Sequence, residues 1–188
     1  MEQEIATRVI PISSPSEMPA LRDKCKAALD RRKICIRVCA GTACIAGGSL
    51  EVYEELKKQI GERGIEVDVE LLFEGEETDV GASKSGCHGF CQMGPLVRVE
   101  PMGTFYNKVK VEDVPNIISA TLEEEGVVEE LLFEKQDGSR AATEQEVPFY
   151  AGQKRIVLGG CGTINPEDIR NYFAVDGYQG LARCLTEM

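Results

Sequence analysis

Hydrophobic side chains recur at strand or helix spacing over most of the chain between about residues 32 and 130. Residues 33–39 alternate between apolar and polar side chains and predict a strand that ends at Cys39. Residues 49–60 carry apolar side chains at helical spacing and predict a helix that stops at Gly61. A second strand is predicted over residues 65–72. The first half of this region therefore has the order strand, helix, strand.

The following part of the chain is polar and rich in glycine as far as Gly86, and we expect it to form a long loop. Residues 96–109 predict a hairpin around a turn at residues 101–103. Apolar positions between residues 114 and 122 recur at helical spacing and predict a helix closed by Gly126. The complete order of strand, helix, strand, long loop, hairpin and helix indicates an α/β sandwich of the thioredoxin type.

Segments at both ends lie outside this sandwich. Ser14 and Glu17 have the spacing of a capping box and predict a helix in the N-terminal segment, residues 1–31. Residues 134–150 are mostly polar and predict a linker between the sandwich, residues 32–133, and a C-terminal α/β extension, residues 151–188. The extension begins with a predicted short strand and a glycine turn. A helix capped by Asn165 and a second short helix after Gly177 should follow.

The composition is typical of one globular domain with a small appendage. Of the 188 residues, 43% are hydrophobic and 28% are charged, and no apolar run approaches the roughly 20 residues of a membrane-spanning helix. The acidic N-terminus does not resemble a secretory signal, so we expect a cytoplasmic protein without membrane insertion. The net charge of -11 argues against nucleic-acid binding along the phosphate backbone and favours a basic protein partner.

Eight cysteines in a cytoplasmic chain indicate metal or redox chemistry more than a disulfide framework. Two close pairs stand among glycines, as Cys39-x4-Cys44 and Cys87-x3-Cys91. Four thiolates from two loops can enclose a metal centre, because soft sulfur ligands select iron-sulfur clusters, zinc or copper. A 2Fe-2S cluster needs two thiolates on each iron and backbone N–H groups near its sulfurs, and glycine permits that close approach.

Several other interpretations of these cysteines remain open. A structural zinc ion also takes four thiolates, and the spacings do not exclude it. Disulfides, inert thiols and ligation by His88 are further alternatives. A thioredoxin-like thiol oxidoreductase is disfavoured, because it would carry Cys-x-x-Cys at the first strand-to-helix turn. The remaining cysteines have no clear partner in a ligand loop and are assigned to no site: Cys25, Cys35, Cys161 and Cys184.

The two ligand loops, residues 38–44 and 86–101, resemble the thioredoxin-like 2Fe-2S ferredoxin module of respiratory complex I and its relatives. The resemblance covers residues 33 to about 133. It is strongest to the module at the N-terminus of the NADH-binding flavoprotein subunit of soluble NAD-linked enzymes, such as electron-bifurcating hydrogenases. The resemblance implies a 2Fe-2S cluster that carries single electrons. It also implies that the cluster ligands are Cys39, Cys44, Cys87 and Cys91.

Residues 155–169 and 177–188 resemble the opening of that flavoprotein subunit. In the family a glycine-rich stretch that holds FMN and NADH follows this opening, so we expect a fragment or a split gene with no complete catalytic site. The glycines at residues 159–162 are weak evidence for a phosphate loop by themselves. The expected partners are other subunits of a redox enzyme, including one with a flavin or an iron-sulfur cluster, and a homodimer is a further expectation. Formate dehydrogenase, complex I and aromatic-ring reductase assemblies are alternative contexts.

Overall fold

A computed structural model describes residues 12–30, 32–64, 67–68, 80–123 and 126–188. Its centre is a mixed sheet with the strand order β2-β3-β1-β4-β5. The three strands β2, β3 and β1 are parallel, whereas β4 is antiparallel to both β1 and β5. The strands are β1 (Ile34–Cys39), β2 (Val67–Asp68), β3 (Val80–Ser85), β4 (Val97–Glu100) and β5 (Thr104–Tyr106).

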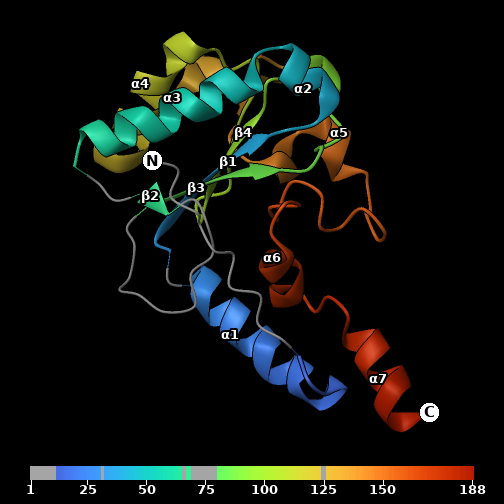
Figure 1. The fold of residues 1–188 in the computed structure, drawn as a ribbon. Coiled ribbons are helices and arrows are strands. Elements are labelled where there is room, and N and C mark those ends of the chain that lie inside the picture. Colours follow the sequence, from blue (N-terminus) through green and yellow to red (C-terminus); the bar gives the residue numbers. More distant parts are fainter. Residues whose placement is uncertain (1–11, 31, 65–66, 69–79, 124–125) are drawn as a thin grey trace.

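Helices lie on both sides of the sheet (Figure 1). On one side, α3 (Ser49–Glu62) and α4 (Val114–Ile118) pack over the strands, and a π-helical turn, Ser119–Glu123, continues α4. Fully buried side chains of α3, α4 and the sheet form the main core, among them Leu56, Ile117, Ile36 and Val99. This arrangement is the predicted thioredoxin-like α/β fold.

The N-terminal helix packs against the C-terminal extension rather than against the main core. In Figure 1, α1 (Met18–Asp30) and α6 (Ile169–Ala174) lie together on the side of the sheet opposite α3. A second cluster of buried side chains joins them, and it contains Met18, Leu21, Cys25, Ala28, Phe173, Ala174 and Ala182. The two ends of the chain therefore stabilise each other.

Most of the predicted elements are confirmed, with small shifts at their ends. The first strand ends at Cys39 as expected, and the hairpin consists of β4 and β5. The helix predicted to stop at Gly61 continues to Glu62. Ser14 caps the N-terminal helical segment as predicted, accepting a hydrogen bond from the Ser16 N–H. Of the strand predicted over residues 65–72, the described residues 67–68 form β2, and the others lie outside the described residues.

The expected long loop before Gly86 is wrong in its last part, because Val80–Ser85 forms β3 in the middle of the sheet. Its small side chains show no apolar alternation and have a low intrinsic preference for strands. Pairing with neighbouring strands makes this segment a strand, because β3 lies between β1 and β2 and pairs with both. At Gly81 a Cβ atom would lie only 2.7 Å from Cδ of Arg32, so the strand is also tightly covered.

The segment predicted as a linker, residues 134–150, is structured and packed against the sheet. It contains most of a short hairpin, β6 (Phe133–Glu134) with β7 (Arg140–Ala141), then a 3₁₀ turn, Glu144–Glu146, and α5 (Pro148–Ala151). The burial of a few residues fixes it in place, although its average composition is polar. Those residues are Ala141, Glu144, Val147 and Tyr150. The domain boundaries themselves stay predictions.

The C-terminal extension departs from its predicted elements. Residues 155–158 form no strand, since none of the described strands pairs with them, and residues 157–158 begin a run of turns. The first helix begins at Ile169, and its N-cap is Asp168 instead of Asn165, since the Asp168 carboxylate accepts the Arg170 N–H. The predicted second helix is confirmed as α7 (Gln179–Glu187).

None of the helices within the described ranges is long and apolar enough to cross a membrane.

Replacement of Phe173 by alanine should loosen α1, because Phe173 is a large apolar side chain of the cluster that joins α1 to α6. We expect the free energy of opening of α1 to fall by about 3 kcal/mol, with little change in β1. Amide hydrogen exchange, measured residue by residue, tests this. Leu185→Ala is the matched control, since Leu185 is 64% exposed. Unchanged exchange in α1 of Phe173→Ala would show that the two ends do not depend on each other.

Candidate metal centre

Two of the four predicted ligands are buried at the end of the first strand. Cys39 is the last residue of β1, and Cys44 lies in the short helix α2 (Thr42–Ala46) that follows. Both side chains are excluded from solvent. The backbone N–H of Cys39 donates to the carbonyl of Leu96, which fixes the end of the strand against the start of the hairpin. Leu96, Phe105, Val147 and Tyr150 belong to the same buried cluster as the two cysteines.

The other two predicted ligands lie at the surface beside this pair. Cys87 is in the loop after β3, and Cys91 begins the 3₁₀ turn Cys91–Met93. Both are exposed, and their Sγ atoms are 3.8 Å apart. A tetrahedral metal with sulfur ligands at about 2.3 Å would hold two of them about 3.8 Å apart. This separation therefore suits two thiolates on one metal atom.

The sheet brings the two cysteine pairs together. Strands β1 and β3 are parallel neighbours, and Cys39 stands opposite Ser85 in their register. Because the carboxyl ends of parallel neighbouring strands meet at the same edge of a sheet, the loops that follow them share that edge. Gly41 allows the loop after β1 to approach the loop after β3 closely, since a Cβ atom at Gly41 would lie 3.0 Å from Cβ of Cys87.

Backbone N–H groups approach the sulfurs, as a cluster site requires. The Gly89 N–H donates to Sγ of Cys87 at 3.3 Å. Hydrogen bonds from the Cys44 thiol and then from the N–H groups of Gly41 and His88 outweigh burial and lower the pKa of Cys39 to about 6. The hydrogen bond to Cys39 and burial raise the pKa of Cys44. Without a metal, Cys39 is therefore the thiolate of this pair and Cys44 stays protonated.

The residues fit a 2Fe-2S cluster. Such a cluster needs two thiolates on each iron, and the four predicted ligands form two neighbouring pairs, with Cys39 hydrogen-bonded to Cys44 and with Cys87 beside Cys91. Gly94 adds to the fit, because a Cβ atom there would lie 2.6 Å from Sγ of Cys44.

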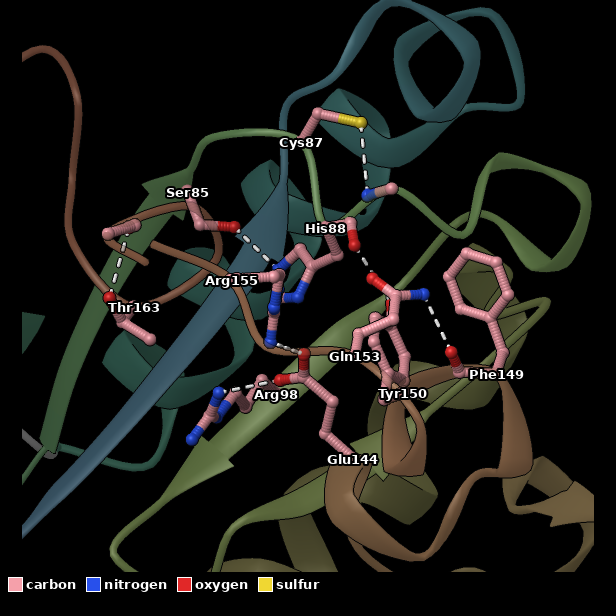
Figure 2. Close-up of polar contacts among 12 residues, drawn as sticks. Ser85, Cys87, His88, Arg98, Glu144, Phe149, Tyr150, Gln153, Arg155 and Thr163 are labelled. Carbon is pink, nitrogen blue, oxygen red and sulfur yellow. Dashed lines mark hydrogen bonds and ion pairs between the residues drawn. The ribbon is translucent and has the colours of Figure 1, made fainter. Parts of the chain in front are cut away.

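His88 supports the ligand loop and does not face the sulfurs. Its ring is buried and points toward Ser85 and away from the sulfur of Cys87 (Figure 2). The Ser85 hydroxyl and Nε2 of His88 share a hydrogen bond of 2.9 Å, and the ring packs beside Phe105. Burial, followed by the positive charges of Arg98, Arg155 and Arg37, lowers the pKa of His88 to about 4. The ring is therefore neutral near pH 7. Its contacts with Ser85 and Phe105 anchor the loop between Cys87 and Cys91 to the sheet.

Sequence reasoning missed the residues from the supposed linker that reach this loop. The Tyr150 hydroxyl donates to the His88 carbonyl at 3.0 Å, and the buried carboxylate of Glu144 forms ion pairs with Arg98 and Arg155 (Figure 2). One signal in the sequence could have indicated this contact. The aromatic pair Phe149 and Tyr150 ends an otherwise polar segment, and large aromatic side chains are seldom left in a solvated linker.

The glycine run of the extension lies beside His88. Residues 159–162 form turns, and Gly162 has φ +83. A Cβ atom at Gly162 would lie 2.5 Å from Nδ1 of His88, so this glycine lets the backbone of the extension approach the His88 ring closely. The helix that follows starts only at Ile169. The other cysteines are still assigned to no site: Cys25 and Cys35 are buried thiols, Cys161 is half-buried and Cys184 is exposed.

Known proteins share the part of the chain that carries the two ligand loops. The sequence model of a family described as thioredoxin-like [2Fe-2S] ferredoxin matches residues 28–122. A 2Fe-2S ferredoxin from Aquifex aeolicus is 34% identical over 93 residues, which are 50% of this chain and 75% of that protein. A 2Fe-2S ferredoxin from Clostridium pasteurianum is 28% identical over 88 residues, covering 47% of this chain and 76% of the relative.

A crystal structure of the thioredoxin-like ferredoxin from Aquifex aeolicus aligns with 55% of this chain and 99% of its own chain. The sequence identity of that alignment is 28%, and the TM-score is 0.45.

Replacement of Gly94 by alanine should weaken metal retention, because the new methyl group would meet the sulfur of Cys44. We expect chelators to remove iron about 10- to 100-fold more readily, the effect typical of changes directly behind a metal ligand. Gly86→Ala is the matched control, since a Cβ atom there has no neighbour within 4 Å. Iron per chain against chelator concentration is the measurement. Equal retention in the two variants would contradict the packing of Gly94 on the ligand.

Proposed function

Because the chain belongs to the thioredoxin-like [2Fe-2S] ferredoxin family, we propose that it carries single electrons within a multi-subunit NAD(H)-linked oxidoreductase. The family implies a 2Fe-2S cluster, and we propose that its ligands are Cys39, Cys44, Cys87 and Cys91. The observation that carries this assignment is the meeting of two cysteine pairs at the shared edge of β1 and β3.

The cluster supplies a centre that accepts and releases one electron at a time. The residues of this chain hold that centre in a fixed geometry and limit its contact with water. Cys39 and Cys44 are buried in the protein, whereas Cys87 and Cys91 are exposed. We therefore propose that electrons enter and leave on the side of Cys87 and Cys91, where a partner can approach the metal most closely.

The proposed assembly resembles an electron-bifurcating hydrogenase, in preference to a formate dehydrogenase, complex I or an aromatic-ring reductase. Its support is the resemblance of residues 155–188 to the opening of an NADH-binding flavoprotein subunit. FMN and NAD would bind in the remainder of that subunit. The extension also exposes three consecutive apolar side chains, Ile156 (79%), Val157 (94%) and Leu158 (59%). Contiguous exposed apolar side chains favour contact with another protein surface.

Anaerobic purification, metal analysis and low-temperature EPR test the cofactor and its ligands. We expect a brown protein with about two irons per chain and, after dithionite, a signal of total spin one half, as for a reduced 2Fe-2S cluster. Cys87→Ala and Cys91→Ala should lose the signal, because each removes a proposed ligand. Cys184→Ala should keep it, since Cys184 is exposed on α7, away from the ligand loops. A colourless protein with one zinc per chain would instead support a structural docking module.

The proposed context predicts that NADH reduces the cluster only through a flavoprotein partner. Stopped-flow absorption of the loaded protein, mixed with NADH and the FMN- and NAD-binding remainder of such a flavoprotein subunit, should show bleaching that NADH alone does not produce. Val157→Asp should weaken the association about tenfold, because it places a charge on the proposed contact surface, about 1.4 kcal/mol. Lys26→Ala is the control, since Lys26 is an exposed residue of α1. No bleaching with the partner present would overturn this context.

A further inference from the structure

One peptide unit of the ligand loop is hydrogen-bonded at both ends. The carbonyl of His88 accepts a hydrogen bond from the Tyr150 hydroxyl at 3.0 Å. The N–H of the same peptide unit belongs to Gly89 and donates to Sγ of Cys87 at 3.3 Å. Figure 2 shows Tyr150 and Cys87 on either side of this part of the loop. Because a peptide unit is planar and rigid, a bond that fixes its carbonyl also fixes the direction of its N–H.

Tyr150 is held firmly enough to serve as this support. Its ring meets the rings of Phe105 and Phe90 edge-on, each with a centroid separation of 5.7 Å. The guanidinium of Arg155 lies over the ring, 5.1 Å from its centroid. The neighbouring Phe149 stacks on Phe90, with a centroid separation of 4.7 Å. The two consecutive aromatic residues of α5 thus contact both His88 and Phe90, which lie between Cys87 and Cys91.

A buried carboxylate ties this segment to the sheet. The Glu144 side chain is only 3% exposed, and its two oxygens bind Arg98, at 2.8 Å, and Arg155. Arg98 belongs to β4, so the ion pair joins the hairpin of the sheet to the turn that precedes α5. A buried carboxylate is stable only while its cationic partners, Arg98 and Arg155, stay in place. The ion pairs therefore hold the turn before α5, and with it Tyr150, against the sheet.

These contacts come from residues that follow the range matched by the family model. The family match ends at residue 122, whereas Glu144, Tyr150 and Arg155 lie after it. We name residues 140–155 the strap, because Phe149 and Tyr150 within them contact the loop between Cys87 and Cys91. The strap follows the range that the family model matches, whereas the proposed ligands all lie within that range.

We propose that Tyr150 is a positioning residue of the 2Fe-2S site, acting through the His88–Gly89 peptide unit on the sulfur of Cys87. This inference rests on the proposed function, because it takes Cys87 as a ligand. Hydrogen bonds in a chain polarise one another, so the donation from Tyr150 strengthens the donation from Gly89. Hydrogen bonds to ligand sulfurs favour the more negative, reduced cluster and raise its reduction potential. The strap therefore makes the cluster easier to reduce.

The test is a potentiometric EPR titration of the iron-loaded full chain and its variants. Tyr150→Phe keeps the ring and its packing but removes the donor. We expect normal iron content and a more negative potential, with the ratio of reduced to oxidised cluster at a fixed potential lower by about 1.5- to threefold, a fraction of the effect of one hydrogen bond. Tyr172→Phe is the matched control, since Tyr172 is 45% exposed and contacts Tyr178 rather than the loop. Its potential should equal that of the wild type.

A fluorinated tyrosine at position 150 provides the opposite change, because fluorination makes the hydroxyl a stronger donor without altering the ring packing greatly. The potential should then move above that of the wild type, and this measurement applies even if Tyr150→Phe folds poorly. Unchanged potentials in the variants, with full iron content, would overturn the role of Tyr150 and leave the proposed function intact. A wild-type chain that holds no iron would overturn both, and metal analysis distinguishes the two results.

Discussion

The parallel pairing of β1 with β3 is the constraint on which the site depends. It places Cys39 opposite Ser85, so β1 and β3 end at the same edge of the sheet. One cysteine pair lies at the end of β1, and the other lies in the loop after β3. A shift of one residue in this register would turn the side chain of Cys39 to the other face of the sheet. The main core holds the register, because fully buried side chains from β1, β3 and α3 pack together in it.

The site has a buried cysteine pair, Cys39 and Cys44, and a solvent-exposed pair, Cys87 and Cys91. Cys39 and Cys44 share a buried cluster with Leu96, Phe105 and Tyr150, and Gly94 leaves just enough room for the sulfur of Cys44. Cys87 and Cys91 face solvent, and their loop is held from behind by His88 and by the strap. This division suits an electron carrier, which must keep its metal geometry constant and still bring one edge of it to a partner.

The charges near the site differ from the charge of the whole chain. The net charge of -11 would make an anionic cluster harder to reduce. Close to His88, however, Arg98, Arg155 and Arg37 contribute positive charge. Arg37 is buried and the other two are half-buried, which reduces screening by solvent. Glu144 and Glu100 compensate part of this charge through ion pairs with Arg98. The local and the global electrostatics thus act on the cluster in opposite directions.

The sequence by itself determined the elements that depend on local pattern, and it predicted the ligands. Residues 33–39 and 49–60 have the periodicity of the strand and helix that they form, and the four predicted ligands stand out by their spacing among glycines. Only the tertiary structure decided that Val80–Ser85 is a central strand, because pairing with β1 and β2 outweighs the low strand preference of its small residues. Likewise, residues 134–150 have the composition of a linker, but the burial of Tyr150 and the ion pairs of Glu144 order them. Contacts between residues far apart in the chain leave no periodic signal, so the support of Cys87 by Tyr150 could be found only in the folded protein.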